Sequence, residues 1–323
     1  MKYYWFIGNK RIAETYYREL LEKDEVVFIS KDKAFKNIFL CSAFRFLFSQ
    51  IVNSKIKMPA KKTIFALLLR EYNVLDLNDT VLIFHEGWFD DDISNYLKHT
   101  YIRLKTVLYF DDTVETYSKA IPSLNPYSLK EKYDYVFAYN PSDVAEYGFI
   151  QYNACFSKLN ISYNAERQSD LCFIGQPKDR YTMLKRIFDY LGEKCNCNFI
   201  VVGENDGDDN GIRMTTRYMD YEEYLQHEIS SNCILEILKA DTQGATFRCW
   251  EAVYYNRKLI TNWKGITSFE YYDPRFMMYF EKPEDIDIDF VKSKIEVDYH
   301  YLGDNSPSVF LRNIEGIISG ENC

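Results

Sequence analysis

The chain lacks the residue patterns that mark several large classes of enzyme. It has only four histidines, and its eight cysteines include no Cys-x-x-Cys pair, so neither a zinc site nor a disulfide framework is predicted. Gly8 follows the first predicted strand without a Gly-x-Gly-x-x-Gly sequence, and no Gly-x-Ser-x-Gly sequence occurs. These absences disfavour a dinucleotide-dependent oxidoreductase and a serine hydrolase of the strand–elbow–helix type.

Long apolar runs are also missing. No stretch of 18 or more apolar residues is present, so the sequence predicts no transmembrane helix. The N-terminal segment Met1–Asn9 has the pattern of a strand and turn rather than of a signal peptide. Scattered, unpaired cysteines suit a reducing compartment. We therefore expect a cytoplasmic protein, and attachment to the inner face of the plasma membrane is considered below.

What is present is enough for two domains. The 323 residues are 47% hydrophobic, and domains of about 150 residues are common. Strand-length apolar runs alternate with stretches of helical spacing, the order typical of parallel β-α-β units. The polar stretch 153–168 is the best candidate for a linker. We predict an α/β protein with domains at 1–160 and 161–323, whose last helix, over 306–319, is a candidate to return to the first domain.

The most informative segment runs from Cys233 to Thr261. An apolar strand, Cys233–Leu238, leads through a turn at Gly244 to a helix over Thr246–Tyr255, and Lys258–Thr261 suits a second strand. A glycine at such a junction leaves backbone N–H groups and the positive end of the helix dipole free to hold a phosphate. On the residues alone, the segment also fits an ordinary strand–helix–strand unit with a solvated Glu251.

This segment resembles the donor-binding half of GT-B glycosyltransferases, in particular those of bacterial capsule and lipopolysaccharide synthesis. The resemblance implies two Rossmann-like domains facing a cleft, with Glu251 binding the ribose of a nucleotide. Many sugar-retaining members have a second glutamate eight residues earlier, where this chain has Gln243. That difference leaves open whether the anomeric configuration is inverted or retained.

A second stretch carries the same resemblance. Ser169–Gly175 has the pattern of a strand, Lys178 and Arg180 follow the glycine, and Tyr181–Leu191 has helical spacing. In similar proteins a Gly-x-x-Lys-x-Arg turn contacts the donor diphosphate, and two cations beside a helix N-terminus suit that charge. On the residues alone, the two cations could equally be solvated. The expected donor-binding residues are Gly175, Lys178, Arg180, Gln243, Gly244, Thr246, Arg248 and Glu251.

Candidate catalytic groups follow two predicted strands of the first half. The sequence predicts a strand over Thr80–His85, and His85 and then Glu86 come directly after the apolar run Val81–Phe84. Asp111 and Asp112 likewise come directly after Leu108–Phe110. The carboxyl ends of parallel strands are where open α/β sheets bind ligands. If the reaction inverts, a general base must take the proton of the acceptor hydroxyl. We rank Glu86 first, Asp111 second and His85 third; each could instead cap a helix or contact water.

No metal site or cofactor is predicted. Asp90–Asp92 and Asp111–Asp112 are acidic runs of the kind common at helix starts. Asp206–Gly211 matches the first half of an EF-hand loop, but the twelfth position is Arg217 instead of a glutamate. We therefore expect a metal-independent enzyme in which cationic side chains and helix N-termini stabilise the diphosphate.

Charge is unevenly distributed along the chain. The net charge is −9, yet the window 31–70 has nine cations against Asp32 alone, a net +8, which leaves −17 for the rest. Aromatic residues interleave with these cations, a composition typical of segments that dock on anionic membranes. The strongly acidic remainder disfavours a nucleic-acid partner. The same window could simply form an amphipathic helix packed on the first domain.

Together these patterns predict a glycosyltransferase. It would transfer a sugar from a nucleotide-diphosphate donor to a hydroxyl of a growing surface polysaccharide, expected to be lipid-linked. The alternative is a catalytically inactive GT-B-like scaffold in a polysaccharide assembly complex. Expected partners are a nucleotide-sugar, a glycan or lipid-linked acceptor and an anionic membrane surface contacted through 31–70.

Overall fold

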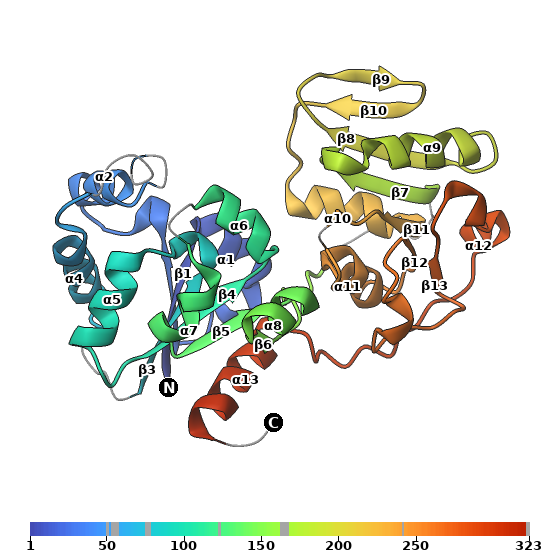
Figure 1. Ribbon diagram of the computed structural model, residues 1–323. Helices are drawn as coiled ribbons and strands as arrows, with labels where there is room; N and C mark the ends of the chain where they lie inside the picture. The colour runs from blue at the N-terminus through green and yellow to red at the C-terminus, as the bar shows by residue number, and fades with distance from the viewer. Residues whose placement is uncertain are drawn as a thin grey trace. The chain divides into compact units, whose positions relative to one another are not determined.

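The chain forms two compact units. The computed structural model describes residues 1–49, 52, 58–74, 79–121, 124–161, 168–240 and 242–320. Unit 1 comprises Met1–Ser157 and Asn305–Cys323, and unit 2 comprises Lys158–Asp304 (Figure 1). Each unit has its own apolar core and its own sheet, which is parallel apart from one strand pair in unit 2.

Unit 1 is built on a six-stranded sheet with the order β2-β1-β3-β4-β5-β6. All its neighbouring strands are parallel. The strands are nearly continuous apolar runs because helices cover both faces of a parallel sheet. They are β1 (Lys2–Ile7), β2 (Val26–Ser30), β3 (Thr80–His85), β4 (Lys105–Phe110), β5 (Tyr135–Ala138) and β6 (Ile150–Gln151).

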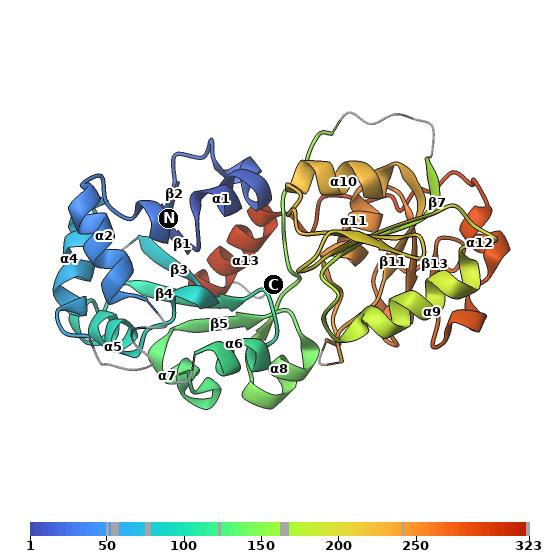
Figure 2. The same ribbon diagram turned by 90° about the horizontal axis from the view of Figure 1, so that it is seen from above.

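The described helices of unit 1 lie on the two faces of this sheet (Figure 2). They are α1 (Lys10–Tyr16), α2 (Ile38–Leu47), α4 (Lys61–Glu71), α5 (Asp91–Thr100), α6 (Val114–Ala120), α7 (Leu129–Lys132), α8 (Pro141–Tyr147) and α13 (Pro307–Ser319). Phe44, Phe65 and Ile93 from α2, α4 and α5 share one core with Phe6 and Phe84 of the sheet. The opposite face is covered by α1 and α13.

Helix α13 belongs to unit 1 although it is the last element of the chain. Phe310 packs against the rings of Trp5 and Tyr109, with centroids 5.9 and 5.8 Å away. The Tyr3 hydroxyl donates to Glu315, and the backbone N–H of Ser308 donates to a carboxylate oxygen of Glu19 at 2.8 Å. The apolar stripe of this helix is therefore buried on the first sheet.

Unit 2 contains a seven-stranded sheet with the order β13-β12-β11-β7-β8-β10-β9, in which only the β9–β10 pair is antiparallel. Its strands are β7 (Ser169–Gly175), β8 (Cys197–Val202), β9 (Gly207–Asp209), β10 (Ile212–Thr215), β11 (Ser231–Glu236), β12 (Lys258–Thr261) and β13 (Met277–Tyr279). Its described helices are α9 (Tyr181–Leu191), α10 (Tyr221–Ile229), α11 (Phe247–Tyr254) and α12 (Ile288–Lys292).

The predicted linker stretch 153–168 contains the boundary between the two units, which falls after Ser157. Before that boundary the chain packs on unit 1, because Ala154, Cys155 and Phe156 are buried and the Ser157 N–H donates to the Tyr16 carbonyl at 2.7 Å. The acidic turn 206–211 is a β-hairpin. Its tip, Asn210 and Gly211, takes positive φ angles of 54° and 99°, which both residue types tolerate.

Candidate active site

In unit 2, two arginines converge on the end of strand β7. The guanidinium carbons of Arg180 and Arg248 lie 5.5 and 4.9 Å from the centre of the Phe173 ring. A methyl group added at Gly175 would come within 3.1 Å of a terminal nitrogen of Arg248 and 3.5 Å of one of Arg180. The absence of a side chain at Gly175 therefore makes room for both cations at the carboxyl edge of the sheet.

Arg180 is held there at an electrostatic cost. It donates to the Ile237 carbonyl at 2.7 Å and to the Gln176 carbonyl at 3.4 Å. Burial, and next the charge of Arg248, lower the pKa of Arg180 to about 10. A pair of like charges of this kind binds an anion favourably, because the anion relieves their repulsion.

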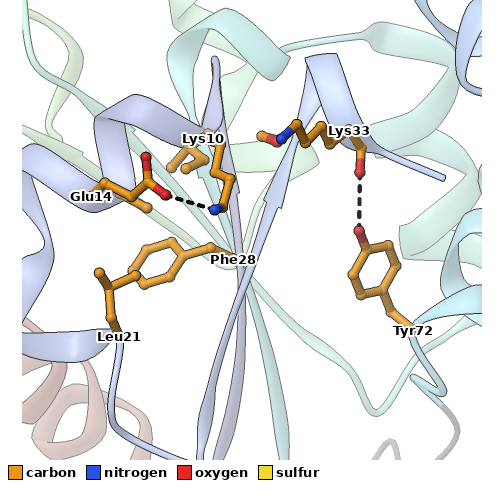
Figure 3. Close-up of a pocket in the computed structure, with 9 residues that line it drawn as sticks. Lys10, Glu14, Leu21, Phe28, Lys33 and Tyr72 are labelled. Atoms are coloured by element: carbon orange, nitrogen blue, oxygen red, sulfur yellow. Dashed lines mark hydrogen bonds and ion pairs between the residues drawn. The ribbon is translucent and has the colours of Figure 1, made fainter. Parts of the chain in front are cut away.

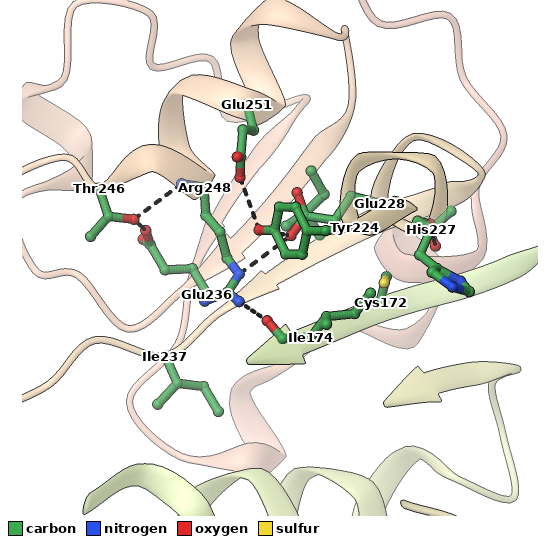
Figure 4. A network of polar contacts seen from close by, with 12 residues as sticks. Cys172, Ile174, Tyr224, His227, Glu228, Glu236, Ile237, Thr246, Arg248 and Glu251 are labelled. Carbon is green, nitrogen blue, oxygen red and sulfur yellow. Dashed lines mark hydrogen bonds and ion pairs between the residues drawn. The ribbon is translucent and has the colours of Figure 1, made fainter. Parts of the chain in front are cut away.

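Arg248 extends from the first turn of α11 into a buried polar network (Figure 4). It donates to the Ile174 carbonyl, and its Nε lies 3.4 Å from a carboxylate oxygen of Glu228. Burial alone would lower the pKa of Arg248, but the surrounding tyrosine and carboxylate groups outweigh burial and raise it. Arg248 is thus a permanently charged part of the site.

The turn before α11 is ordered around Thr246 and Glu236. The Thr246 hydroxyl accepts from the Arg248 N–H at 3.2 Å, which caps the helix, and it donates to Glu236. The Thr261 hydroxyl donates to the other oxygen of Glu236 at 2.5 Å. Gly244 is buried, whereas the side chain of Gln243 is exposed. The two strand ends and the helix start are therefore fixed to one another.

Glu251 is neither solvated nor open to a ligand in this state. It is buried and accepts hydrogen bonds from Tyr221 at 2.8 Å and from Tyr224 at 3.0 Å. Burial, and next the nearby Glu251, raise the pKa of Glu228 well above its ordinary value. Burial raises the pKa of Glu251 as well, so two neighbouring buried carboxyl groups face each other here and their repulsion disfavours the doubly ionised state. To bind a ribose, Glu251 would have to exchange a tyrosine hydroxyl for a ribose hydroxyl.

The residues that surround Glu251 and Arg248 escape a reading of the sequence: Tyr221, Tyr224, Glu228 and Glu236. One signal was available for three of them, since Tyr221, Tyr224 and Glu228 recur at helical spacing after Asp220, which caps α10. Lys178 lies in the short 3-10 turn Lys178–Arg180, but its side chain lies outside the described residues.

In unit 1, the three candidate catalytic residues lie together beyond strands β3 and β4. His85 Nε2 is 2.9 Å from Glu86 Oε1 and 3.4 Å from Asp111 Oδ2. The Asp111 N–H donates to Glu86 Oε2 at 3.2 Å, and the Gly87 N–H donates to His85 Nδ1 at 3.3 Å. The parallel pairing of β3 with β4 brings these strand ends side by side.

Burial separates the roles of these three groups. Glu86 is completely buried, while the side chain of Asp111 is 21% exposed. Burial would lower the pKa of His85, but the charges and hydrogen bonds of Glu86 and Asp111 prevail and raise it to about 10. The two carboxylates therefore favour protonation of His85, although the charged ring would give up the hydrogen bond that Nδ1 accepts from the Gly87 N–H. Of the two carboxylates, that of Asp111 is the more accessible.

Unit 1 also contains a pocket of about 330 Å³ at the carboxyl ends of β1 and β2 (Figure 3). Phe28 and Leu21 supply its apolar wall, and Lys10, Lys33 and Glu14 supply charge at its rim. Lys10 forms an ion pair with Glu14 at 2.6 Å. An amphipathic cavity of this kind suits a ligand with both an apolar or ring face and a polar group.

Among the residues that the structure describes, no group of three metal-ligating side chains is present. The acidic run of 90–92 has partners elsewhere: Asp90 caps α5 and pairs with Lys61 at 2.7 Å, and Asp91 pairs with Lys132. In the β9–β10 hairpin, Asp209 accepts from Lys185 at 2.8 Å and from Tyr181 at 2.5 Å.

Comparison of the chain with known proteins identifies its fold. No family model and no curated protein matches the sequence. The structure matches an α,α-trehalose-phosphate synthase (UDP-forming) from Burkholderia vietnamiensis with a TM-score of 0.56 and 8% identity, covering 99% of this chain and 98% of the other. It matches a trehalose-6-phosphate synthase, OtsA, with a TM-score of 0.50 and 10% identity over 90% of both chains.

A match to TarM has a TM-score of 0.48 and 12% identity, and the chain spans about half of TarM's length, 52%. The match to the Burkholderia synthase extends over both units. The chain therefore has the GT-B fold that the sequence predicts, with two α/β units that each contain a parallel sheet.

Proposed function

We propose that this protein is a glycosyltransferase that uses a nucleotide-diphosphate sugar. The observation that carries the proposal is the arginine pair beside Gly175, where two cations face a position without a side chain. Such a pair suits the diphosphate of a donor and the charge that develops on it as the glycosidic bond breaks. A fold match to a UDP-forming synthase supports the same chemistry.

Unit 2 would bind the donor. Arg180 and Arg248 would contact the diphosphate together with Lys178 and the N–H groups around Gly244–Thr246, where α11 begins. Glu251 would bind the ribose after releasing Tyr221 or Tyr224. Because the two arginines already supply positive charge, the transfer is expected to proceed without a divalent cation.

Unit 1 would bind the acceptor and supply the base if the reaction inverts. The acceptor oxygen would bond to the anomeric carbon, its proton would pass to Asp111, and the bond to the diphosphate would break. Glu86, ranked first from the sequence, is completely buried and would instead hold His85 in its charged form. If the configuration is retained, Asp111 would not act as a base, and Gln243 leaves that outcome open.

We further propose that the acceptor is a lipid-linked glycan of a surface polysaccharide and that helix α2 contacts an anionic membrane. The helix directs Phe44 into the core but leaves Phe39 and Phe46 82% and 58% exposed. Five cations of the 31–70 window are exposed: Lys33 and Lys36 before α2, Arg45 within it, and Lys62 and Arg70 on α4. Exposed rings among cations suit the interface of an anionic bilayer.

Not every cation of the 31–70 window is available to contact a membrane. Lys61 is buried and paired with Asp90 and Asp92, which corrects its expected place on the surface. Lys31 donates to the Gly87 carbonyl and lies over the Trp88 ring. Lys55 and Lys57 lie outside the described residues. No described helix is long and apolar enough to cross a membrane.

The donor proposal is tested by thermal unfolding of the full chain with UDP, GDP, CDP, dTDP or NAD in metal-free buffer. A ligand at 100 times its dissociation constant adds about 2.7 kcal/mol of stability, several degrees in Tm. Selective stabilisation by one nucleoside diphosphate supports the proposal. Stabilisation by NAD alone, or by none of the five, overturns it. Nucleotide binding without consumption of the matching nucleotide-sugar would favour the scaffold alternative.

The membrane proposal is tested by sedimentation with vesicles of phosphatidylglycerol and phosphatidylcholine. The double variant Phe39→Ser, Phe46→Ser and the variant Arg45→Glu should each reduce binding about tenfold or more. Ile102→Ser, at another exposed apolar position, serves as the matched control. Equal binding by all variants, or equal binding to neutral vesicles, contradicts the proposal.

A further inference from the structure

The carboxylate of Asp111 is surrounded by hydroxyl groups from distant parts of unit 1. The Tyr152 hydroxyl lies 2.5 Å from Oδ1, and the Tyr17 hydroxyl lies 3.4 Å from Oδ2. His85 Nε2 is 3.4 Å from the same Oδ2. Tyr17 follows α1 and Tyr152 follows β6, so the tertiary structure alone brings these donors to strand β4.

The direction of one chain of hydrogen bonds follows from its two ends: Trp5 can only donate, and the ionised Asp111 carboxylate can only accept and takes the proton of Tyr17. The indole N–H of Trp5 donates to the Tyr109 hydroxyl at 2.9 Å. Tyr109 and Tyr17 are 3.0 Å apart. The proton of Tyr109 then points to Tyr17, and the proton of Tyr17 points to Asp111. All three groups are buried, and aligned donors of this kind strengthen one another.

Tyr152 differs because its hydroxyl has one proton but faces two acceptors. It lies 2.5 Å from Asp111 Oδ1 and 3.0 Å from the carbonyl oxygen of Phe110. When Asp111 is ionised, Tyr152 can donate to the carboxylate. When Asp111 is protonated, its own O–H can donate to the Tyr152 oxygen, and the Tyr152 proton can turn to Phe110. Both protonation states of Asp111 therefore keep a full set of hydrogen bonds.

The C-terminal helix holds the rings that carry these groups. Phe310 of α13 packs with centroid distances of 5.0 Å to Tyr152, 5.8 Å to Tyr109 and 5.9 Å to Trp5. It also lies 5.4 Å from Phe137. A side chain near the end of the chain thus packs against three of the hydrogen-bonding rings at once.

We infer that Tyr152 is a positioning residue that lets Asp111 accept and release a proton, and that Trp5, Tyr109 and Tyr17 form a directed support for its ionised state. The inference rests on the proposed function only in taking Asp111 as the base. The proton would come from the acceptor hydroxyl, reside on Asp111 as a carboxylic acid, and leave to solvent after the product departs. No other co-reactant is needed.

The test compares the titration of Asp111 in the wild type and in Tyr152→Phe. The full chain is labelled with ¹³C at aspartate carboxyl carbons, and Asp111→Asn assigns the signal. Tyr152 hydrogen-bonds to Asp111 in both protonation states, but its bond to the charged carboxylate is stronger by about 1 kcal/mol, so the midpoint should rise by about 0.7 unit in Tyr152→Phe. The other titratable groups that act on this cluster are common to all variants: His85, Glu86, Asp112, Tyr117 and Cys155.

Two further variants make the result decisive. Tyr17→Phe should shift the midpoint in the same direction by less, because its bond is longer, and it decides the matter if Tyr152→Phe does not fold. Tyr299→Phe is the control: this buried tyrosine of unit 2 donates to the Arg257 carbonyl at 3.0 Å and should leave the midpoint unchanged.

An unchanged midpoint in Tyr152→Phe and Tyr17→Phe overturns the inference, whether or not a nucleotide binds. Failure of nucleotide binding would overturn the proposed function and leave this titration result standing. If transfer activity is found and inverts, Tyr152→Phe should lower kcat about tenfold and leave KM for the donor unchanged. A merely structural role would not separate the two constants.

Discussion

Replacing Arg180 with methionine should separate the stability of unit 2 from its ability to bind a nucleotide. In the free protein, burial and next the charge of Arg248 lower the pKa of Arg180 from its ordinary value to about 10. At 1.36 kcal/mol per unit, holding this cation costs about 3 kcal/mol. Because the pKa of Arg180 is lower in the folded state than in the unfolded state, the cost applies at every pH below 10. It disappears only when the pH exceeds the pKa of the unfolded state.

Other contacts offset most of that cost. Arg180 donates to the Ile237 carbonyl at 2.7 Å and stacks on Phe173 at 5.5 Å. A hydrogen bond from a charged donor contributes about 1.5–3 kcal/mol and a partly buried cation–π contact about 1 kcal/mol. Methionine retains much of the apolar stem. The free energy of unfolding of Arg180→Met should therefore stay within about 1 kcal/mol of the wild type.

Nucleotide binding should respond very differently. Loss of one charge-assisted contact with the diphosphate should weaken binding about 100-fold, close to 3 kcal/mol. Urea unfolding measures the stability of each variant. Isothermal titration calorimetry measures its affinity for the nucleoside diphosphate that stabilises the wild type. Arg217→Met is the control, because Arg217 is exposed and paired with Glu223. Wild-type affinity in Arg180→Met, or an equal loss in Arg217→Met, would refute the assignment of the arginine pair.

Three further predictions follow from the same geometry. Gly175→Ala should weaken nucleotide binding about tenfold in calorimetry, because its methyl group would displace Arg248, 3.1 Å away. Unchanged affinity would contradict the proposal that the space at Gly175 lets both arginines reach the diphosphate. The pKa of His85 is about 10 in the folded protein, above its ordinary 6.5. The contribution of protonated His85 to the free energy of unfolding is therefore full below pH 6.5 and is lost as the pH rises through 10. Asp111→Asn should flatten the fall in unfolding free energy between pH 7 and 10, and an unaltered slope argues against the ion pair. Phe310→Ala should destabilise the chain by about 3–5 kcal/mol in urea unfolding, and a loss below about 1 kcal/mol would show that α13 is dispensable.

Local pattern was sufficient for the elements themselves. Strand β12 spans Lys258–Thr261 and β3 spans Thr80–His85, as the apolar runs predict. Helix α9 likewise spans the predicted Tyr181–Leu191. Apolar runs and helical spacing are properties of neighbouring residues, so the α/β class could be read from them. The same holds for the carboxyl strand ends, which place His85, Glu86 and Asp111 near one another. The GT-B resemblance rested instead on two glycine turns, Gly175 with Lys178 and Arg180, and Gly244 with Glu251.

Burial and partners could not be read in this way, because they depend on residues far apart in the sequence. Glu251 is covered by Tyr221, which lies 30 positions earlier in the sequence. Whether Glu251 is accessible to a ribose therefore could not be read from the sequence. Lys61 belongs to the basic window by sequence but pairs with Asp90.

The proposed order of the catalytic candidates depends on the fold for the same reason. Packing of the sheet buries Glu86 and leaves Asp111 partly accessible, whereas both follow apolar strands in the sequence. The sequence by itself determined which residues could carry charge and where strands end. The tertiary structure decided which of those charges are desolvated, paired or open to a ligand, because desolvation depends on neighbours that only folding brings together.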